Sequence, residues 1–434
     1  MKISFFLILV FIFNGLSAQF DDDFADAYFD VLEQNDKFSG SVAIAKDGKI
    51  IYRRAIGYSD FENRKKNDSE TAFRIGSISK TFTATMIMKA VEEEKINLNQ
   101  TIDKYFPTVK NADKITVEML LSHRSGIFNI TADPTYLTWN TEPKTEKELV
   151  KMISDYDSNF EPGTEFKYSN SNYILLSFVL EKIYKKPYSK ILEELIIKPL
   201  NLKHTFFKDK IDGSKNEAFS YKYNGNWIKS PVTDMSIPLG AGGISSTPTD
   251  LILFAEALFG GKIVSKESLE KMETMKDGYG FGLFKMPFYD KTAFGHNGGI
   301  DNFSSSLVYF PNEKIAFSMV SNGSDFNEND ISIAMLNLAF GNEIKLPVIK
   351  KSEGEVIPGY TGSFSNGQIG MTIEITENDG KYFAQASGQS AFPLEKISDT
   401  EFRFDLAGIV ILFNPDLKSF TLQQGGGEFI FVKE

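Results

Sequence analysis

The tetrad Ser77-Ile78-Ser79-Lys80 places a serine hydroxyl and a lysine amine three residues apart. Residues 73–76 read as extended, and residues 78–94 read as a largely apolar helix, so the tetrad is expected where a strand turns into a helix. Residues three apart on a helix share one face, so the two groups can meet. A serine hydroxyl needs an adjacent base, and lysine becomes one when burial lowers its pKa. The tetrad therefore predicts Ser77 as a nucleophile and Lys80 as its base.

The same spacing is also compatible with a helix-capping serine followed by a surface lysine. A second copy of the pattern, residues 268–271, falls on a charged helix and is interpreted as accidental. Spacing alone is therefore a weak signal, and further motifs are needed.

Two more motifs follow in order along the chain. Tyr168-Ser169-Asn170 is the only Tyr-x-Asn, and it precedes an apolar helix at 173–180. His296-Asn297-Gly298-Gly299 contains the only His-x-Gly and ends a predicted strand at 292–296. A helix cap beside a core tyrosine and a strand-to-turn histidine are the structural alternatives for these two motifs.

Several other chemistries lack the residues they need. The chain has no cysteine and only three histidines, with no metal-binding spacing among them, so we expect no metal and no cofactor. The sequence contains neither a Gly-x-Ser-x-Gly nucleophile elbow nor a phosphate-binding loop. The net charge of -11 argues against nucleic acid as a partner.

The ordered set of motifs at 75–80, 168–170 and 296–299 resembles the serine β-lactamase and penicillin-binding-protein superfamily. That superfamily includes class C β-lactamases, DD-peptidases and related esterases. The stretches at 120–126 and 242–247 also look similar, and the resemblance covers roughly residues 24–340.

The resemblance implies a role for each motif. Ser77 would attack a carbonyl to form an acyl-enzyme, with Lys80 and Tyr168 sharing the role of base. The backbone N–H groups of Ser77 and Gly299 would form the oxyanion hole. The residues expected to bind substrate are Asn170, His296, Asn297 and Gly298.

The third motif departs from the β-lactamase pattern. A lysine stands there in true β-lactamases and supplies a fixed positive charge, whereas His296 is expected to be largely neutral near pH 7. His-x-Gly is commoner in the esterase and peptidase-like branches of the superfamily. We therefore expect a serine hydrolase acting on an ester, peptide or amide, with cell-wall-derived molecules among the candidate substrates. A catalytically silent binding or sensing protein of the same fold is the alternative.

The element pattern predicts an α/β (α+β) fold. An antiparallel sheet flanked by helices would be built from both ends of the segment, with a helical subdomain inserted between them. A small all-β domain would follow. The predicted domains are a signal peptide at 1–18, a hydrolase domain at 19–345 and an accessory β domain at 355–434. Predicted strands lie at 41–45, 50–54, 278–285, 292–296, 304–310 and 314–320, and predicted helices at 78–94, 249–259, 265–275 and 329–340.

The N-terminus has the features of a signal peptide. Lys2 precedes an apolar run at 3–13, and the small residues Gly15 and Ala18 follow. The run is shorter than the ~20 residues that span a bilayer. We therefore expect cleavage after Ala18, a mature chain with no membrane span, and a periplasmic or extracellular location.

Overall fold

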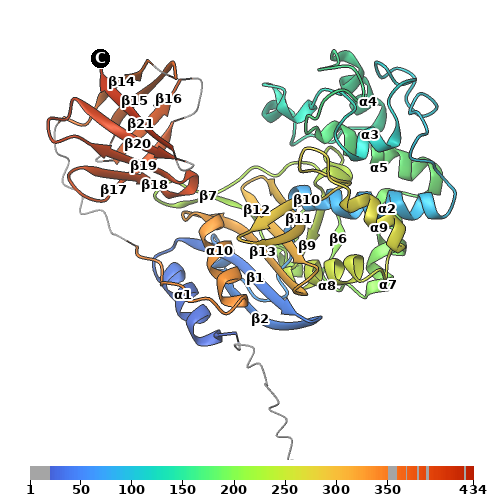
Figure 1. The fold of residues 1–434 in the computed structure, drawn as a ribbon, viewed down its shortest axis with the longest axis horizontal. Coiled ribbons are helices and arrows are strands. Elements are labelled where there is room, and N and C mark those ends of the chain that lie inside the picture. The colour runs from blue at the N-terminus through green and yellow to red at the C-terminus, as the bar shows by residue number, and fades with distance from the viewer. Residues whose placement is uncertain (1–19, 350–358, 368, 379–380, 388–390, 425–426) are drawn as a thin grey trace, which may run out of the picture.

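The computed structural model describes residues 20–349, 359–367, 369–378, 381–387, 391–424 and 427–434. The predicted signal peptide at 1–18 lies outside the described residues. Figure 1 shows an α/β body followed by an all-β barrel, which confirms the predicted fold class.

The body is organised around an antiparallel sheet of order β10-β11-β12-β13-β1-β2. Its strands are β1 (Phe38–Lys46), β2 (Lys49–Ile56), β10 (Phe284–Phe288), β11 (Lys291–Ile300), β12 (Phe303–Phe310) and β13 (Ile315–Ser324). Strand β1 pairs with both β2 and β13, which places the first strands of the body beside its last strand. The sheet is thus assembled from both ends of the segment, as the sequence predicted.

Helices cover both faces of this sheet (Figure 1). On one face, α1 (Asp22–Gln34) and α10 (Glu328–Ala339) share an apolar core with the strands. On the other face, α2 (Ser79–Glu92) and α8 (Pro248–Phe259) belong to a larger core that extends into the inserted subdomain. Nearly every residue of α2 is buried, so this helix holds its first turn rigidly in the centre of the molecule.

The remaining elements of the body are further helices, of which α5 is the longest, and short strands. The other helices are α3 (Val117–Leu121), α4 (Glu146–Asp155), α5 (Asn170–Tyr184), α6 (Tyr188–Leu192), α7 (Lys198–Leu200) and α9 (Lys266–Glu273). The minor strands are β3 (Tyr58–Asp60), β4 (Lys65–Lys66), β5 (Phe73–Arg74), β6 (Phe206–Phe207), β7 (Tyr221–Tyr223), β8 (Trp227–Lys229) and β9 (Ile244–Ser246).

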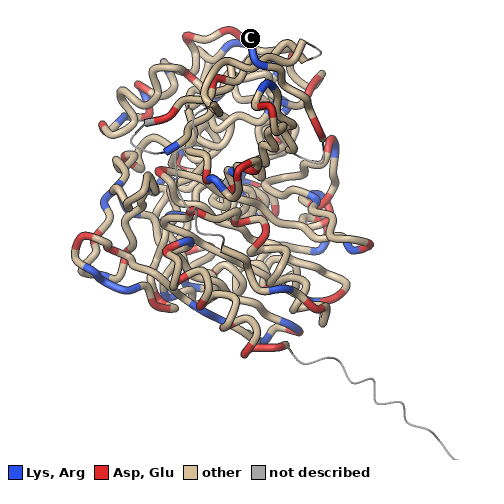
Figure 2. Tube along the Cα trace, turned by 90° about the vertical axis from the view of Figure 1, so that its left-hand side faces the viewer, with Lys and Arg blue, Asp and Glu red and all other residues tan. Residues whose placement is uncertain are grey.

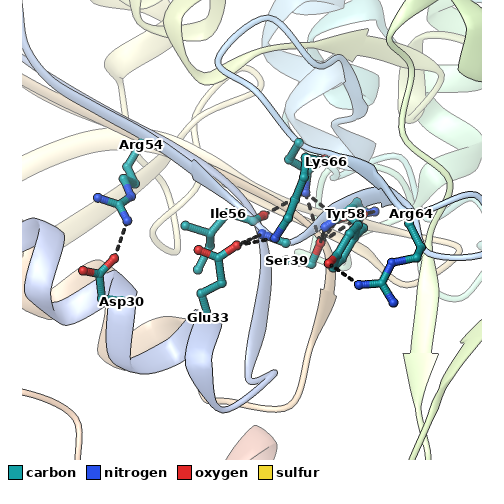
Figure 3. Close-up of polar contacts among 11 residues, drawn as sticks. Asp30, Glu33, Ser39, Arg54, Ile56, Tyr58, Arg64 and Lys66 are labelled. Atoms are coloured by element: carbon teal, nitrogen blue, oxygen red, sulfur yellow. Dashed lines mark hydrogen bonds and ion pairs between the residues drawn. The ribbon is translucent and has the colours of Figure 1, made fainter.

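Polar contacts fix α1 to the strands beside it (Figure 3). Asp30 pairs with Arg54 on β2, and Glu33 pairs with Lys66 on β4 at 2.8 Å. These ion pairs are partly exposed and are worth about 1 kcal/mol or less each. The buried apolar side chains of α1 therefore hold the helix in place, and the ion pairs set its register.

One predicted strand was misplaced. Residues 278–285 were expected to be extended, but β10 begins only at Phe284. Gly278 and Gly282 adopt positive φ angles of +78° and +66° there, which turns the chain instead of extending it. The displaced segment folds into a turn that packs against the first turn of α2, where Thr81 Oγ1 donates to the carbonyl oxygen of Gly282 at 2.7 Å.

The C-terminal part is a closed barrel. Its strands are β14 (Gly362–Asn366), β15 (Met371–Asn378), β16 (Lys381–Ala386), β17 (Phe392–Lys396), β18 (Glu401–Phe404), β19 (Ile409–Phe413), β20 (Ser419–Gln424) and β21 (Gly427–Lys433). The barrel interior is filled by its own apolar cluster. Among the described strands, closure pairs each one with two neighbours.

Charged residues are distributed along the surface of both parts. Figure 2 shows Lys and Arg interspersed with Asp and Glu along the trace. Within the described ranges, no helix has both the length and the apolar character needed to cross a membrane.

Candidate active site

Ser77 lies in a single 3₁₀ turn, Gly76–Ile78, between β5 and α2. This turn packs directly against β11. Gly76 has a φ of +48°, and a Cβ on it would lie 2.6 Å from the backbone nitrogen of Gly299. A Cβ on Gly298 would collide with the carbonyl oxygen of Ile75. Glycine at both positions therefore lets the backbone of Gly299 approach the turn that carries Ser77.

Lys80 reaches back from α2 to Ser77. Its Nζ lies 3.0 Å from Ser77 Oγ, 2.7 Å from Asn170 Oδ1 and 2.6 Å from the carbonyl oxygen of Ala241. The side chain is fully buried, and none of these three partners is a carboxylate. Burial therefore holds the pKa of Lys80 well below its usual range.

The three contacts of Lys80 fit a neutral amine. Such an amine has two N–H donors and one lone pair. An ammonium would donate to all three oxygens. In the neutral form, which burial favours, the oxygens of Asn170 and Ala241 each accept one N–H and the lone pair faces the Ser77 hydroxyl. The geometry thus suits a lysine that accepts the serine proton. By contrast, Lys271 of the second tetrad pairs with Glu267 on an exposed surface.

Tyr168 lies beside this pair with its hydroxyl buried. The Lys80 Nζ sits 5.0 Å from the centre of the Tyr168 ring. Burial raises the pKa of Tyr168, and the nearby Ser77 side chain opposes this only in part. The phenolate that a base would require is therefore disfavoured, and the neutral phenol is a proton donor.

Asn170 is the first residue of α5, and contacts with a neighbouring loop fix its side chain. Its Nδ2 donates to Thr131 Oγ1 at 2.7 Å, while its backbone N–H donates to Asn129 Oδ1 at 3.0 Å. These contacts orient the Asn170 amide oxygen toward Lys80.

His123 was assigned no role from the sequence, yet its ring packs against the Tyr168 motif. Its Nδ1 accepts from the backbone N–H of Ser169 at 3.2 Å and lies 3.2 Å from Asn172 Nδ2. The ring lies 4.2 Å from that of Tyr168, and burial lowers the His123 pKa well below its usual range. The only sequence signal for His123 was its position in the stretch 120–126, which resembles the superfamily. That resemblance did not predict which residues His123 contacts.

His296 is also buried, and it lies behind Tyr168 with a ring separation of 6.1 Å. Its Nδ1 is 2.5 Å from the carbonyl oxygen of Asn297, and its Nε2 is 3.4 Å from the Tyr279 hydroxyl. Burial, with a smaller contribution from Lys80, lowers the pKa of His296 to about 3. The third motif therefore supplies a neutral histidine.

A cavity of about 540 Å³ opens over Ser77. Of the residues predicted from the sequence, Ser77, Asn170 and Gly299 line it, whereas Tyr168 and His296 are not among its lining residues. Asn297 and Gly298 instead line a second cavity of about 840 Å³, between β10–β12 and α10. Side chains alternate between the two faces of a strand, so Asn297 points away from the face on which its neighbours were expected to act.

Within the described ranges, no group of three or more His, Asp or Glu side chains is arranged to hold a metal ion.

Comparison with known sequences and structures agrees with this arrangement. The model of the Beta-lactamase family matches residues 24–341. The chain belongs to the Beta-lactamase family. The prediction of a β-lactamase-related serine hydrolase is thereby confirmed at the level of the family.

Three known proteins are similar to this chain in sequence or structure. The putative penicillin-binding protein PbpX of Bacillus subtilis is 30% identical to this chain. The aligned region covers 58% of this chain and 63% of the length of PbpX. The teichoic acid D-alanine hydrolase of Staphylococcus aureus is 30% identical over 68% of this chain and 73% of its own. A D-stereospecific amidohydrolase from Streptomyces sp. has 30% identity and a TM-score of 0.60, covering 69% of this chain and 94% of its own.

Proposed function

We propose that Ser77 is the nucleophile of an acyl-enzyme mechanism that hydrolyses D-aminoacyl esters or amides. The observation that carries this proposal is the buried Lys80 amine, 3.0 Å from the Ser77 hydroxyl. A neutral amine at that distance is a general base that needs no further activation.

The acylation step follows from the contacts. Lys80 takes the proton of Ser77 as Oγ bonds to the substrate carbonyl carbon. The oxyanion that forms accepts hydrogen bonds from the backbone N–H groups of Ser77 and Gly299. When the bond to the leaving group breaks, the protonated Lys80 amine gives the proton it took from Ser77 to that group. Water then attacks the acyl carbon and gives a proton to Lys80. The bond to Ser77 Oγ breaks, Lys80 returns the proton to Oγ, and the acid product is released.

The substrate class is inferred from the cavity and from the relatives. Among the described residues that line the Ser77 cavity there is no Lys, Arg or His. A free carboxylate on the substrate would therefore meet no cation at the cavity wall. The names of the Staphylococcus aureus and Streptomyces relatives both specify D-configured substrates. These points favour D-aminoacyl esters and amides over penicillin-type carboxylates.

The decisive experiment is mass spectrometry of the purified chain after incubation with a fluorophosphonate and, separately, with a fluorescent penicillin. We expect a fluorophosphonate adduct on Ser77 and little or no penicillin adduct. Ser77→Ala should lose the adduct, and Ser268→Ala, from the second tetrad, should keep it. An adduct that survives in Ser77→Ala would overturn the assignment, while labelling without turnover of any D-aminoacyl substrate would favour a binding or sensing protein.

We also infer that the chain is exported, with residues 1–18 as its signal peptide. The charged start, the apolar run and the small residues before position 19 support this inference. Expression of the full chain in a bacterium should yield a mature protein that begins at Gln19 outside the cytosol. A full-length product retained in the cytosol would contradict it.

A further inference from the structure

One part of the Ser77 cavity is polar and carries a carboxylate that the proposed mechanism does not use. Asp301 is the only charged side chain among the described residues that line this cavity. It comes directly after β11, two residues beyond Gly299. Polar neighbours in the same cavity are Tyr136, Asn140, Ser230, Thr233 and Asn302.

Hydrogen bonds fix the Asp301 carboxylate. Its Oδ2 accepts from the backbone N–H of Thr233 at 2.9 Å and from Arg74 at 3.1 Å, and its Oδ1 accepts from Thr233 Oγ1 at 2.5 Å. A carboxylate offers about four acceptor positions. Three are used by these partners, which leaves one on Oδ1 for a donor that enters the cavity.

Arg74 does not cancel the negative charge of this region. Its guanidinium also donates to the carbonyl oxygens of Thr233 and Asp209. Burial lowers the pKa of Arg74, and the carboxylates of Asp301, Asp234 and Glu217 oppose that shift. Lys208 is paired with Glu217. The guanidinium is therefore shared between Asp301 and two carbonyl oxygens, and it contacts only Oδ2, so Oδ1 of Asp301 keeps an acceptor position for a cation.

The position of Asp301 suits the amine of an aminoacyl substrate. At ~3.3 Å per residue of extended strand, its Cα lies about 7 Å from that of Gly299. Suppose that the Gly299 N–H binds the carbonyl oxygen of an aminoacyl substrate. The α-carbon of that substrate is one bond from the carbonyl carbon, and its amine nitrogen is two bonds away. The amine is therefore within reach of the Asp301 side chain, either directly or through one water molecule.

We propose that Asp301 is the specificity-determining residue that binds the α-ammonium group of the substrate. This inference rests on the proposed function and deepens it, because it limits the substrates to D-aminoacyl esters or amides whose amine is free. N-acylated substrates lack the positive charge and lose the contact.

The test compares two substrates with one leaving group, D-alanine p-nitroanilide and N-acetyl-D-alanine p-nitroanilide. We expect the wild-type chain to prefer the free amine by about tenfold or more in kcat/KM, as for a charge-assisted hydrogen bond. In Asp301→Asn, which keeps the shape and leaves an amide oxygen to accept from the Thr233 N–H, this preference should fall to within about threefold of unity.

Asp234→Asn is the matched control, since it removes a carboxylate near Arg74 that does not line the cavity. It should retain the wild-type preference, so loss of preference in both variants would point to a general effect of charge and overturn the inference. A purely structural role for Asp301 would lower both rates together and leave their ratio unchanged, which also overturns it.

Two outcomes separate the inference from the proposed function. Equal hydrolysis of both substrates by the wild-type chain would overturn the ammonium site while leaving the mechanism on Ser77 intact, and this comparison needs no variant to fold. Hydrolysis of neither substrate would remove the proposed function, and the inference with it.

Discussion

Lys80 shows how one residue gains its chemistry from its surroundings. Its helix is nearly all buried, and its amine meets two neutral oxygens and one hydroxyl. A carboxylate within contact would have restored the ammonium form and removed the base. The same residue type on α9, paired with Glu267, has no such role, so burial and partners distinguish two identical spacings.

His296 gives a prediction at the residue scale. Its pKa is about 3 in the folded protein, against 6.5 as the ordinary value. Between these two pH values the unfolded chain binds a proton that the folded chain does not. The free energy of unfolding therefore falls as pH falls from 6.5 toward 3, by about 1.4 kcal/mol for each pH unit from this group.

Urea unfolding of the wild-type chain and of His296→Gln between pH 7 and pH 4 measures this contribution. The wild type should lose stability more steeply than the variant over that range. Parallel curves for His296→Gln and the wild type would show that His296 does not remain neutral.

At the scale of elements, sequence patterns predicted what lies close along the chain. Helical spacing placed Lys80 beside Ser77, and hydrophobic pattern located the central helix and the sheet strands. The face of β11 on which Asn297 points was not predicted, because a shift of one residue reverses the face of every side chain on a strand. His123 and Ser169 are 46 residues apart in the sequence, so their contact could not be predicted from the local sequence pattern.

Gly76 provides the prediction at this scale. An alanine there places its Cβ 2.6 Å from the backbone nitrogen of Gly299, so the turn and β11 must separate. We expect Gly76→Ala to lower kcat by about 100-fold, since the two N–H groups of the proposed oxyanion hole, those of Ser77 and Gly299, would move apart.

Gly261→Ala is the matched control for Gly76→Ala. Gly261 also has a positive φ, +67°, but a Cβ on it meets no atom within 4 Å. Both variants bear a backbone penalty of about 1 kcal/mol, and only Gly76→Ala should lose activity and slow the labelling of Ser77. Equal activity in the two variants would show that the approach of Gly299 to the turn is not needed.

At the scale of the molecule, the body and the barrel have separate apolar cores. Contacts of two described lysines join the body to the barrel. Lys37 pairs with Asp325 at 2.7 Å within the body and reaches Glu395 of β17 at 3.7 Å. Lys381 lies against Gly225, in the turn between β7 and β8. The sequence predicted an all-β unit here, but these long-range pairs have no local signature.

The separate cores lead to the last prediction, which also tests our proposal that a domain boundary lies between residues 345 and 355. A chain of residues 20–349 should fold, because it loses no residue of its own core and Lys37 keeps Asp325 as a partner. The partly exposed contact with Glu395 contributes about 1 kcal/mol or less, so kcat on a small amide should stay within about threefold of the full chain.

The turn at Gly225 loses Lys381, and the strand that follows leads to Ser230 and Pro231 in the cavity wall, so KM should change more than kcat. Calorimetry and steady-state kinetics on the two chains measure both effects, and an aggregated or unfolded 20–349 chain would mean that the barrel is part of the body's fold.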